Sequence, residues 1–199
     1  YEAGYSFKAD GVFGSDDHLF AKAVFFYDDV KDFIAPKGWF EPTTPPTVYY
    51  SSQNVGHVVR KGIELSGTYA AGQFSTSVSY GLLHAVDKET NERMNGITPQ
   101  SANLKLAYAF PAQAINVWYR AHWSKGGESS VEDRATGKNL HFSSFLTHSL
   151  GAEWSPKVAD LANLQAGIAV VNLFDKEYRM LNGSSGSGRG VRLWLSAQF

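Results

Sequence analysis

The sequence predicts an all-β fold: a transmembrane, antiparallel, up-and-down β-barrel to which this chain contributes about nine strands. Three observations support this prediction. Apolar and polar residues alternate with a period of two in nine segments, and helix periodicity is nearly absent. The connections between these segments alternate between short turns and long loops. The chain also contains 19 glycines, as expected of an all-β protein with many turns.

Composition excludes several classes of protein. The formal net charge of −1 gives no bulk field for nucleic acid. The absence of cysteine excludes disulfides, thiolate catalysis and cysteine-based zinc sites. No apolar run approaches the roughly 18 residues of a spanning helix, whereas barrel strands escape a hydropathy search because they alternate. The chain begins at Tyr1 without an initiator Met or a signal peptide, so we expect a mature or truncated chain.

The last strand, residues 191–199, shows the alternation most clearly. Val191, Leu193 and Leu195 fall on one face, and Arg192 and Trp194 fall on the other. The same pattern predicts the other strands, each about ten residues long, which is enough for a tilted strand to cross a bilayer. The predicted strands are residues 1–10, 19–34, 63–69, 74–82, 103–110, 115–123, 146–154, 164–170 and 191–199.

Turns and loops separate these strands. Short turns are predicted at 14–17, 71–73, 111–113 and 156–163, and long loops at 36–54, 87–100 and 125–139. Short turns at one edge and long loops at the other are typical of an outer-membrane barrel. Complete bacterial single-chain barrels have an even number of strands, so nine strands imply further strands upstream.

A soluble barrel or sandwich with the opposite face buried is the alternative, because alternation alone does not show which face is wet. The polar face is rich in Ser, Thr, Gly, Asn and Gln, which suits a hydrated lumen. The apolar face gathers Tyr, Trp and Phe near strand ends, as interfacial girdles do. These two features favour the membrane barrel.

Four segments carry a family resemblance. They are Tyr1-Glu2-Ala3-Gly4-Tyr5, Gly62-Ile63-Glu64-Leu65, Asn172-Leu173-Phe174-Asp175-Lys176-Glu177-Tyr178, and Gly188-Arg189 before a strand that ends in Phe199. Over essentially all of residues 1–199, the chain resembles the C-terminal barrel portion of TonB-dependent outer-membrane receptors. The resemblance implies a barrel of about 22 strands closed by an N-terminal plug domain. This chain would supply its last strands, with neither the plug nor a TonB-contacting segment.

The resemblance also implies a function. A receptor of this family in the bacterial outer membrane imports a ferric siderophore or haem, using energy delivered by TonB through the plug. It needs no intrinsic cofactor, and the sequence leaves haem, a ferric siderophore and cobalamin open as the ligand. The implied partners are outer-membrane lipid, the TonB system, a haem-carrier protein and the barrel assembly machinery, which recognises a final aromatic residue such as Phe199.

Candidate ligand-binding residues lie in or beside the long loops, or in the loop of the last hairpin. The aromatic ones are expected to stack on a chelate or haem, or alternatively on each other. The histidines are candidates for haem iron, or alternatively solvent-facing or hydrogen-bonded histidines. The candidates are Trp39, Phe40, Tyr49, Tyr50, His57, His84, Arg93, His141, Tyr178 and Arg179.

Other polar residues are expected to have structural roles. Arg60, Arg120 and Arg192 face the lumen, where they pair with carboxylates of the wall or plug or guide an anionic ligand. Asn172 and Asp175, with Tyr178, are expected to organise the last hairpin loop.

No catalytic or metal-binding residues are predicted. Asp28, Asp29 and Asp32 form a small acidic cluster, but the first two point to opposite faces and lack partners at metal-ligand spacing. No nucleophile-elbow pattern surrounds any serine. The alternatives to a TonB-dependent importer are a passive porin-like channel and an outer-membrane barrel hydrolase.

Overall fold

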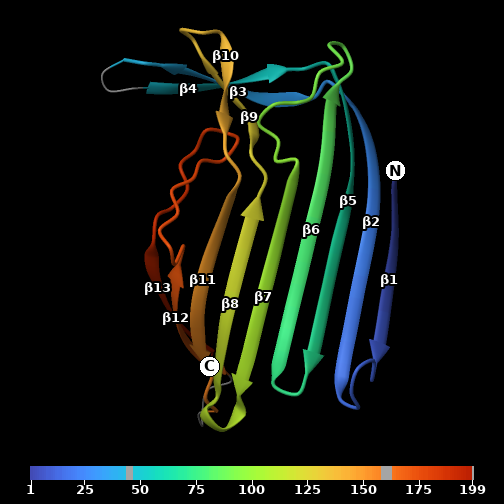
Figure 1. Ribbon diagram of the computed structural model, residues 1–199, viewed down its shortest axis with the longest axis vertical. Helices are drawn as coiled ribbons and strands as arrows, with labels where there is room; N and C mark the ends of the chain where they lie inside the picture. The colour runs from blue at the N-terminus through green and yellow to red at the C-terminus, as the bar shows by residue number, and fades with distance from the viewer. Residues whose placement is uncertain (44–46, 158–162, 199) are drawn as a thin grey trace.

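In the computed structural model, which describes residues 1–43, 47–157 and 163–198, nine long strands form one antiparallel sheet (Figure 1). The strand order is β1-β2-β5-β6-β7-β8-β11-β12-β13, so the chain runs up and down across the sheet. This confirms the all-β class and the nine predicted strands. The strands are β1 (Glu2–Asp10), β2 (Asp17–Lys31), β5 (His57–Ala71), β6 (Phe74–Asp87), β7 (Gln100–Phe110), β8 (Ile115–Ser124), β11 (Phe145–Trp154), β12 (Asn163–Val171) and β13 (Gly190–Gln198).

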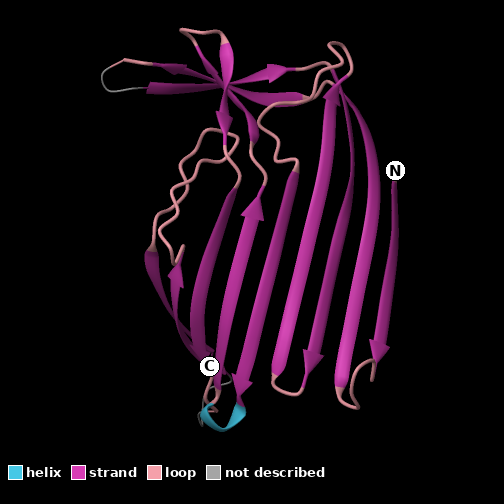
Figure 2. Cartoon of the chain, in the orientation of Figure 1, coloured by secondary structure: helices cyan, strands magenta, loops and turns pink. Residues whose placement is uncertain are grey.

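The sheet is curved but not closed. Its edge strands β1 and β13 recede from the viewer in Figure 1 and do not pair with each other. The short turns lie at one edge of the sheet and include the 3₁₀ turn η1 (Pro111–Gln113), which Figure 2 draws as a helix. Within the described ranges no helix has the length and apolarity that a membrane crossing requires.

The prediction of irregular loops at 36–54 and 125–139 was wrong in part, because four further strands lie within or overlap these ranges. These pair as a second sheet at the long-loop end, in the order β10-β9-β3-β4. Its central pairing is parallel and joins Gly38 to Val131, a distant relationship that no local alternation reveals. Prolines at 36 and 42 also interrupt the period of two. The strands are β3 (Ile34–Glu41), β4 (Thr47–Asn54), β9 (Gly127–Asp133) and β10 (Lys138–Phe142).

Two barrel strands are longer than predicted. The predicted strands 63–69 and 74–82 become β5 with 15 residues and β6 with 14, while β2, predicted at 19–34, contains 15. Residues 57–62 of β5 and 83–87 of β6 continue the sheet toward the long-loop end. The three strands therefore carry polar outward positions above the apolar ones.

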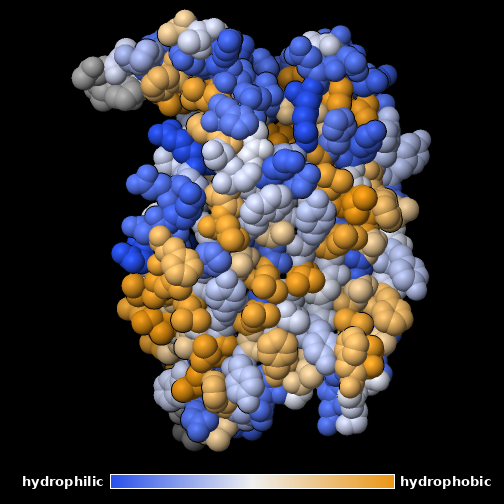
Figure 3. Space-filling model, in the orientation of Figure 1, coloured by the Kyte–Doolittle hydropathy of each residue, from blue (hydrophilic) through white to orange (hydrophobic). Residues whose placement is uncertain are grey.

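The two faces of the large sheet differ in polarity as predicted. The apolar side chains of the outward face remain uncovered, with Leu193 and Leu195 each 75% exposed and Phe25 54% exposed. Figure 3 shows apolar residues over the strands and hydrophilic ones gathered at the long-loop end. The inner face lines a groove of about 530 Å³ with residues that include Ser66, Ser77 and Asn103. An apolar outer face of this extent requires lipid or another apolar cover.

Candidate functional site

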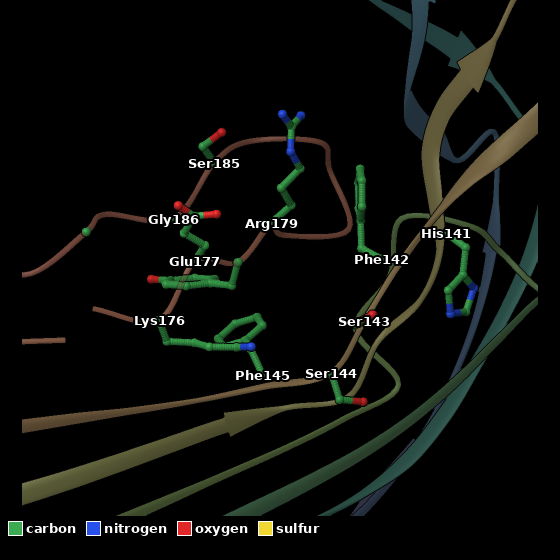
Figure 4. Close-up of a pocket in the computed structure, with 12 residues that line it drawn as sticks. His141, Phe142, Ser143, Ser144, Phe145, Lys176, Glu177, Arg179, Ser185 and Gly186 are labelled. Atoms are coloured by element: carbon green, nitrogen blue, oxygen red, sulfur yellow. The ribbon is translucent and has the colours of Figure 1, made fainter. Parts of the chain in front are cut away.

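A pocket of about 460 Å³ lies between the start of β11 and the loop that joins β12 to β13 (Figure 4). It brings together three of the predicted ligand-binding residues, His141, Tyr178 and Arg179. As drawn in Figure 4, the Phe142 ring stands between Arg179 and His141. The pocket thus combines an imidazole, a phenol, a guanidinium group and aromatic walls.

The loop that forms one wall of this pocket is fixed by Asn172. Its side chain donates to the carbonyls of Lys176 at 2.9 Å and Ser187 at 3.0 Å, and accepts from the Lys176 amide at 2.9 Å. Asp175 accepts from the Arg189 amide at 2.7 Å. Both Asn172 and Asp175 have positive φ, a conformation that short polar side chains tolerate. The prediction that they organise the last hairpin loop is confirmed.

Tyr178 is held against the barrel wall by two contacts. Its ring stacks on Phe145, with ring centroids 4.1 Å apart. Gly186 lies on the ring, and any Cβ there would overlap it. The position of Tyr178 in the pocket therefore depends on one buried aromatic residue and one glycine.

His141 is exposed, and a carboxylate orients it. Its Nδ1 lies 3.0 Å from Oε1 of Glu128, while its side chain is 64% exposed. Among the described residues Nε2 has no hydrogen-bond partner. A carboxylate on one ring nitrogen fixes the orientation of the ring, as in many histidines that bind metals.

The aromatic residues of the predicted loop 36–54 lie on the second sheet. Trp39 and Tyr49 stack on each other with centroids 5.5 Å apart, and the Arg134 guanidinium lies 4.8 Å from the Trp39 ring centroid. Arg134 also pairs with Glu41. These two aromatics thus pack within their own loop region, while Tyr50 is exposed and Phe40 partly buried. Sequence reasoning missed Arg134, which is remote from Trp39 along the chain.

The remaining candidates lie away from the pocket. Nε2 of His57 lies 2.6 Å from Oδ1 of Asp29, and Arg93 donates to the Leu83 carbonyl at 3.3 Å. His84 shares the outward face of β6 with Leu82 and is exposed. The structure therefore does not place these three with His141. Sequence reasoning also missed Phe142 and Lys176, which line the pocket.

The inner wall forms a second pocket of about 430 Å³. Tyr178 lines both this pocket and the first one. Trp118 lies on the floor of the second pocket, 6% exposed, with Arg120 stacked 4.7 Å from its ring centroid. The Trp118 Nε1 is buried and has no partner among the residues that the structure describes. Arg192 also lines this pocket.

The lumen-facing arginines differ in their partners. Arg60 pairs with Asp28 on the neighbouring strand at 2.9 Å, as expected for an arginine of the wall. In the described part of the chain, neither Arg120 nor Arg192 forms an ion pair. Two guanidinium groups of the inner wall thus remain available for an anionic partner.

The acidic cluster does not form a metal site. Asp28 pairs with Arg60 and Asp29 with His57, which places them in separate interactions. Across residues 1–43, 47–157 and 163–198, no group of three His, Asp or Glu side chains is arranged to hold a metal ion.

This curved sheet, with an uncovered apolar outer face, a polar inner face and loops at one end, is the wall of a membrane β-barrel. Residues 1–173 match the family described as TonB dependent receptor-like, beta-barrel, and the chain belongs to this family. The family is located in the outer membrane, and its members are receptors and transporters rather than enzymes.

Two relatives support this assignment. Heme/hemopexin utilization protein C of Haemophilus influenzae (strain 86-028NP) is 24% identical over 188 residues, which cover 92% of this chain and 26% of that protein. TonB-dependent heme receptor A of Haemophilus ducreyi is 24% identical over 222 residues, covering 98% of this chain and 29% of that protein. The chain thus spans little more than a quarter of the length of these relatives.

Solved structures share the fold. The FrpB iron transporter from Neisseria meningitidis (F3-3 variant) has a TM-score of 0.66 at 20% identity, covering 96% of this chain and 29% of that chain. The ferripyoverdine receptor of the outer membrane of Pseudomonas aeruginosa has a TM-score of 0.61 at 16% identity, covering 96% of this chain and 26% of that chain.

Proposed function

We propose that this chain forms part of the barrel of an outer-membrane receptor that imports haem with energy supplied through TonB. The observation that carries the proposal is the pocket that gathers His141, Tyr178 and Arg179 at the long-loop end of the wall. Haem receptors among the relatives support haem over other iron chelates.

The chemistry of the pocket suits haem. Imidazole and phenolate are both axial ligands of haem iron in proteins, and His141 and Tyr178 offer one of each. Phe142 presents aromatic surface to a planar macrocycle. Arg179 and Lys176 offer positive charge to its two carboxylates.

Haem titration of the full-length receptor, followed by absorbance, tests this site. We expect His141→Ala and Tyr178→Phe to weaken binding and to change the absorbance of the bound haem. His84→Ala is the matched control, because His84 faces outward, and it should bind as the unmodified receptor does. Unchanged spectra in both pocket variants would reject the site. Binding of a ferric catecholate in place of haem would make the receptor a siderophore importer.

The aromatic loop is proposed as an outer capture surface for the same ligand. Replacing Trp39, Phe40, Tyr49 and Tyr50 together by Ala should weaken haem binding without unfolding the barrel. Single replacement of Trp39 also removes its stacking on Tyr49 and Arg134, so barrel integrity must be checked by heat-modified electrophoretic mobility. Unchanged affinity of the quadruple variant would discard this loop as a site.

The inner wall supports the proposal of a plug that delivers energy from TonB. The unpaired Arg120 and Arg192 and the buried N–H of Trp118 suit a partner that carries carboxylates and other acceptors. A plugged receptor should stay mostly closed in planar bilayers, whereas steady ion conductance would favour a passive porin-like channel.

Assembly is proposed to use the terminal aromatic residue. Phe199 lies outside the described residues. Its deletion should lower the yield of receptor inserted by the barrel assembly machinery, and normal insertion would refute this role. A haem-carrier protein is a further proposed partner, which would deliver its ligand to the long-loop end.

A further inference from the structure

Two of the residues expected at the ligand vestibule, His84 and Arg93, belong instead to a basic cluster on the outer wall. Lys61 of β5 lies directly opposite Tyr27 of β2 on one side and His84 of β6 on the other. Because side chains alternate along each strand, all three share the outward face with Ile63. They form one row across three strands near the long-loop end.

Arg93 brings a third basic group to this row. It forms an isolated antiparallel bridge with Val86, an outward position on β6. Its Nη2 donates to the carbonyl of Leu83 at 3.3 Å, and that carbonyl belongs to the peptide unit that ends at the nitrogen of His84. The guanidinium group therefore lies beside the backbone of His84.

The positive charge of this cluster is not neutralised by ion pairs. None of Lys61, His84 and Arg93 has an ion-pair partner within the described parts of the chain. The outward Asp29 is already bonded to His57, and Asp87 accepts from the amides of Glu89 and Thr90. The Glu89 carboxylate lies against Gly56, and Glu92 lines a pocket with Arg93 but forms no ion pair with it within the described residues.

An apolar row lies immediately beneath the basic one. Phe25, Ile63 and Leu82 are paired across the same three strands, two residues further from the long loops. Two residues of a strand span about 7 Å, so the surface changes from apolar to basic over a short distance. Figure 3 shows the same change, with hydrophilic residues gathered at the long-loop end.

We propose that Lys61, His84 and Arg93 bind the phosphate of a membrane lipid in the leaflet at the long-loop end. Its acyl chains lie on the apolar row of Phe25, Ile63 and Leu82. An arginine supplies paired N–H donors to phosphate oxygens, and lysine adds a point charge. Basic residues at the polar boundary of an apolar surface attract anionic headgroups. This inference rests on the outward face meeting lipid and is independent of haem import.

Native mass spectrometry of the detergent-solubilised, full-length receptor tests the proposal with two matched probes. Phosphatidic acid carries a phosphate, and diacylglycerol has the same chains without it. We expect phosphatidic acid to bind and diacylglycerol not to bind. Lys61→Gln combined with Arg93→Gln should reduce bound phosphatidic acid by about fivefold for each cation removed, and His84→Gln should reduce it less.

The control is Lys22→Gln combined with Lys105→Gln, which removes two charges from the inner face. It should retain the lipid, and all variants should keep the heat-modified mobility of a folded barrel. Equal binding by the outer-wall variant and the unmodified receptor would overturn the proposal. Displacement of phosphatidic acid by an equal concentration of inorganic phosphate would overturn it too, because the acyl chains would then contribute nothing.

Discussion

The indole of Trp118 on β8 lies across the backbone of Gly151, its direct partner on β11. A large side chain on the inner face can lie flat only where the neighbouring strand has no Cβ, and aromatic cover of strand glycines is a known way to fix register. Two further pairs repeat the arrangement on the same face. They are Trp194 with Gly167 and Phe26 with Gly62.

Replacing Gly151 by Ala should therefore destabilise the barrel. The new Cβ would overlap the Trp118 ring and lie 2.9 Å from the Ile168 carbonyl, so both side chain and backbone must shift. Overpacking of this kind costs about 1–3 kcal/mol, which urea unfolding in lipid vesicles can measure. Gly67→Ala is the control, because its Cβ would meet its neighbours at an ordinary 3.5 Å. Equal unfolding midpoints for the two variants would contradict the prediction.

His148 is a polar residue on an apolar face, and its hydrogen-bond partner is Tyr119. Its Nδ1 lies 2.5 Å from the hydroxyl of Tyr119 on the adjacent strand, and both side chains face outward. Phe174 packs edge-on against the imidazole at 5.0 Å. The pair thus satisfies two polar groups at an apolar surface.

Tyr119→Phe should lower barrel stability by about 1–3 kcal/mol, because it leaves an imidazole facing lipid without its partner. His148→Leu combined with Tyr119→Phe should recover most of the loss, since replacing both partners by apolar groups is nearly neutral. Urea unfolding of the two single variants and the double variant measures this coupling. Additive losses would show that the two residues do not depend on each other.

The large sheet could be predicted from the sequence because a local pattern of residues identifies each of its strands. Strands such as β13 alternate over their whole length, and one face has to meet lipid, so a period of two identifies each of them. The second sheet was missed for the opposite reason. Its β3 and β9 pair across roughly ninety residues of chain, and Pro36 interrupts the pattern of β3.

The candidate site was predicted in part for the same physical reason. Residue type selected His141 beside a long loop and Tyr178 and Arg179 in the last hairpin loop, and these three do share a pocket. The same criteria also selected His84 and Arg93. Because β6 is longer than predicted, His84 lies within the strand and takes its outward face, which nearness to a loop does not reveal. Phe145 escaped notice because its role depends on stacking with a residue 33 positions away.

Asp17 fixes the turn between β1 and β2. Its carboxylate accepts from the amides of Val12, Phe13 and Gly14 at 2.6–2.9 Å and from the Tyr69 hydroxyl at 3.1 Å. Asp17→Ala should leave three amides without an acceptor and speed their hydrogen exchange by about tenfold or more. Asp16→Ala, at an exposed neighbouring position, should leave these rates unchanged. If hydrogen exchange of these three amides were no faster in Asp17→Ala than in the unmodified protein, the strands alone would hold the turn.

Asn172 should control the order of the whole loop that carries Tyr178 and Arg179. Asn172→Ala removes three hydrogen bonds from a side chain that is only 6% exposed, and it places a less tolerant residue at a positive φ. We expect a loss of about 1–3 kcal/mol in local stability, seen as faster hydrogen exchange across residues 172–188.

Haem affinity should fall with loop order in this variant, because Tyr178 is positioned through the loop that Asn172 closes. Asn182→Ala is the matched control, since Asn182 is exposed and its side chain accepts from the backbone amide and hydroxyl of the nearby Ser184. It should change neither exchange nor affinity. Faster exchange in Asn172→Ala with unchanged haem binding would separate loop order from ligand capture and would move the binding site away from Tyr178.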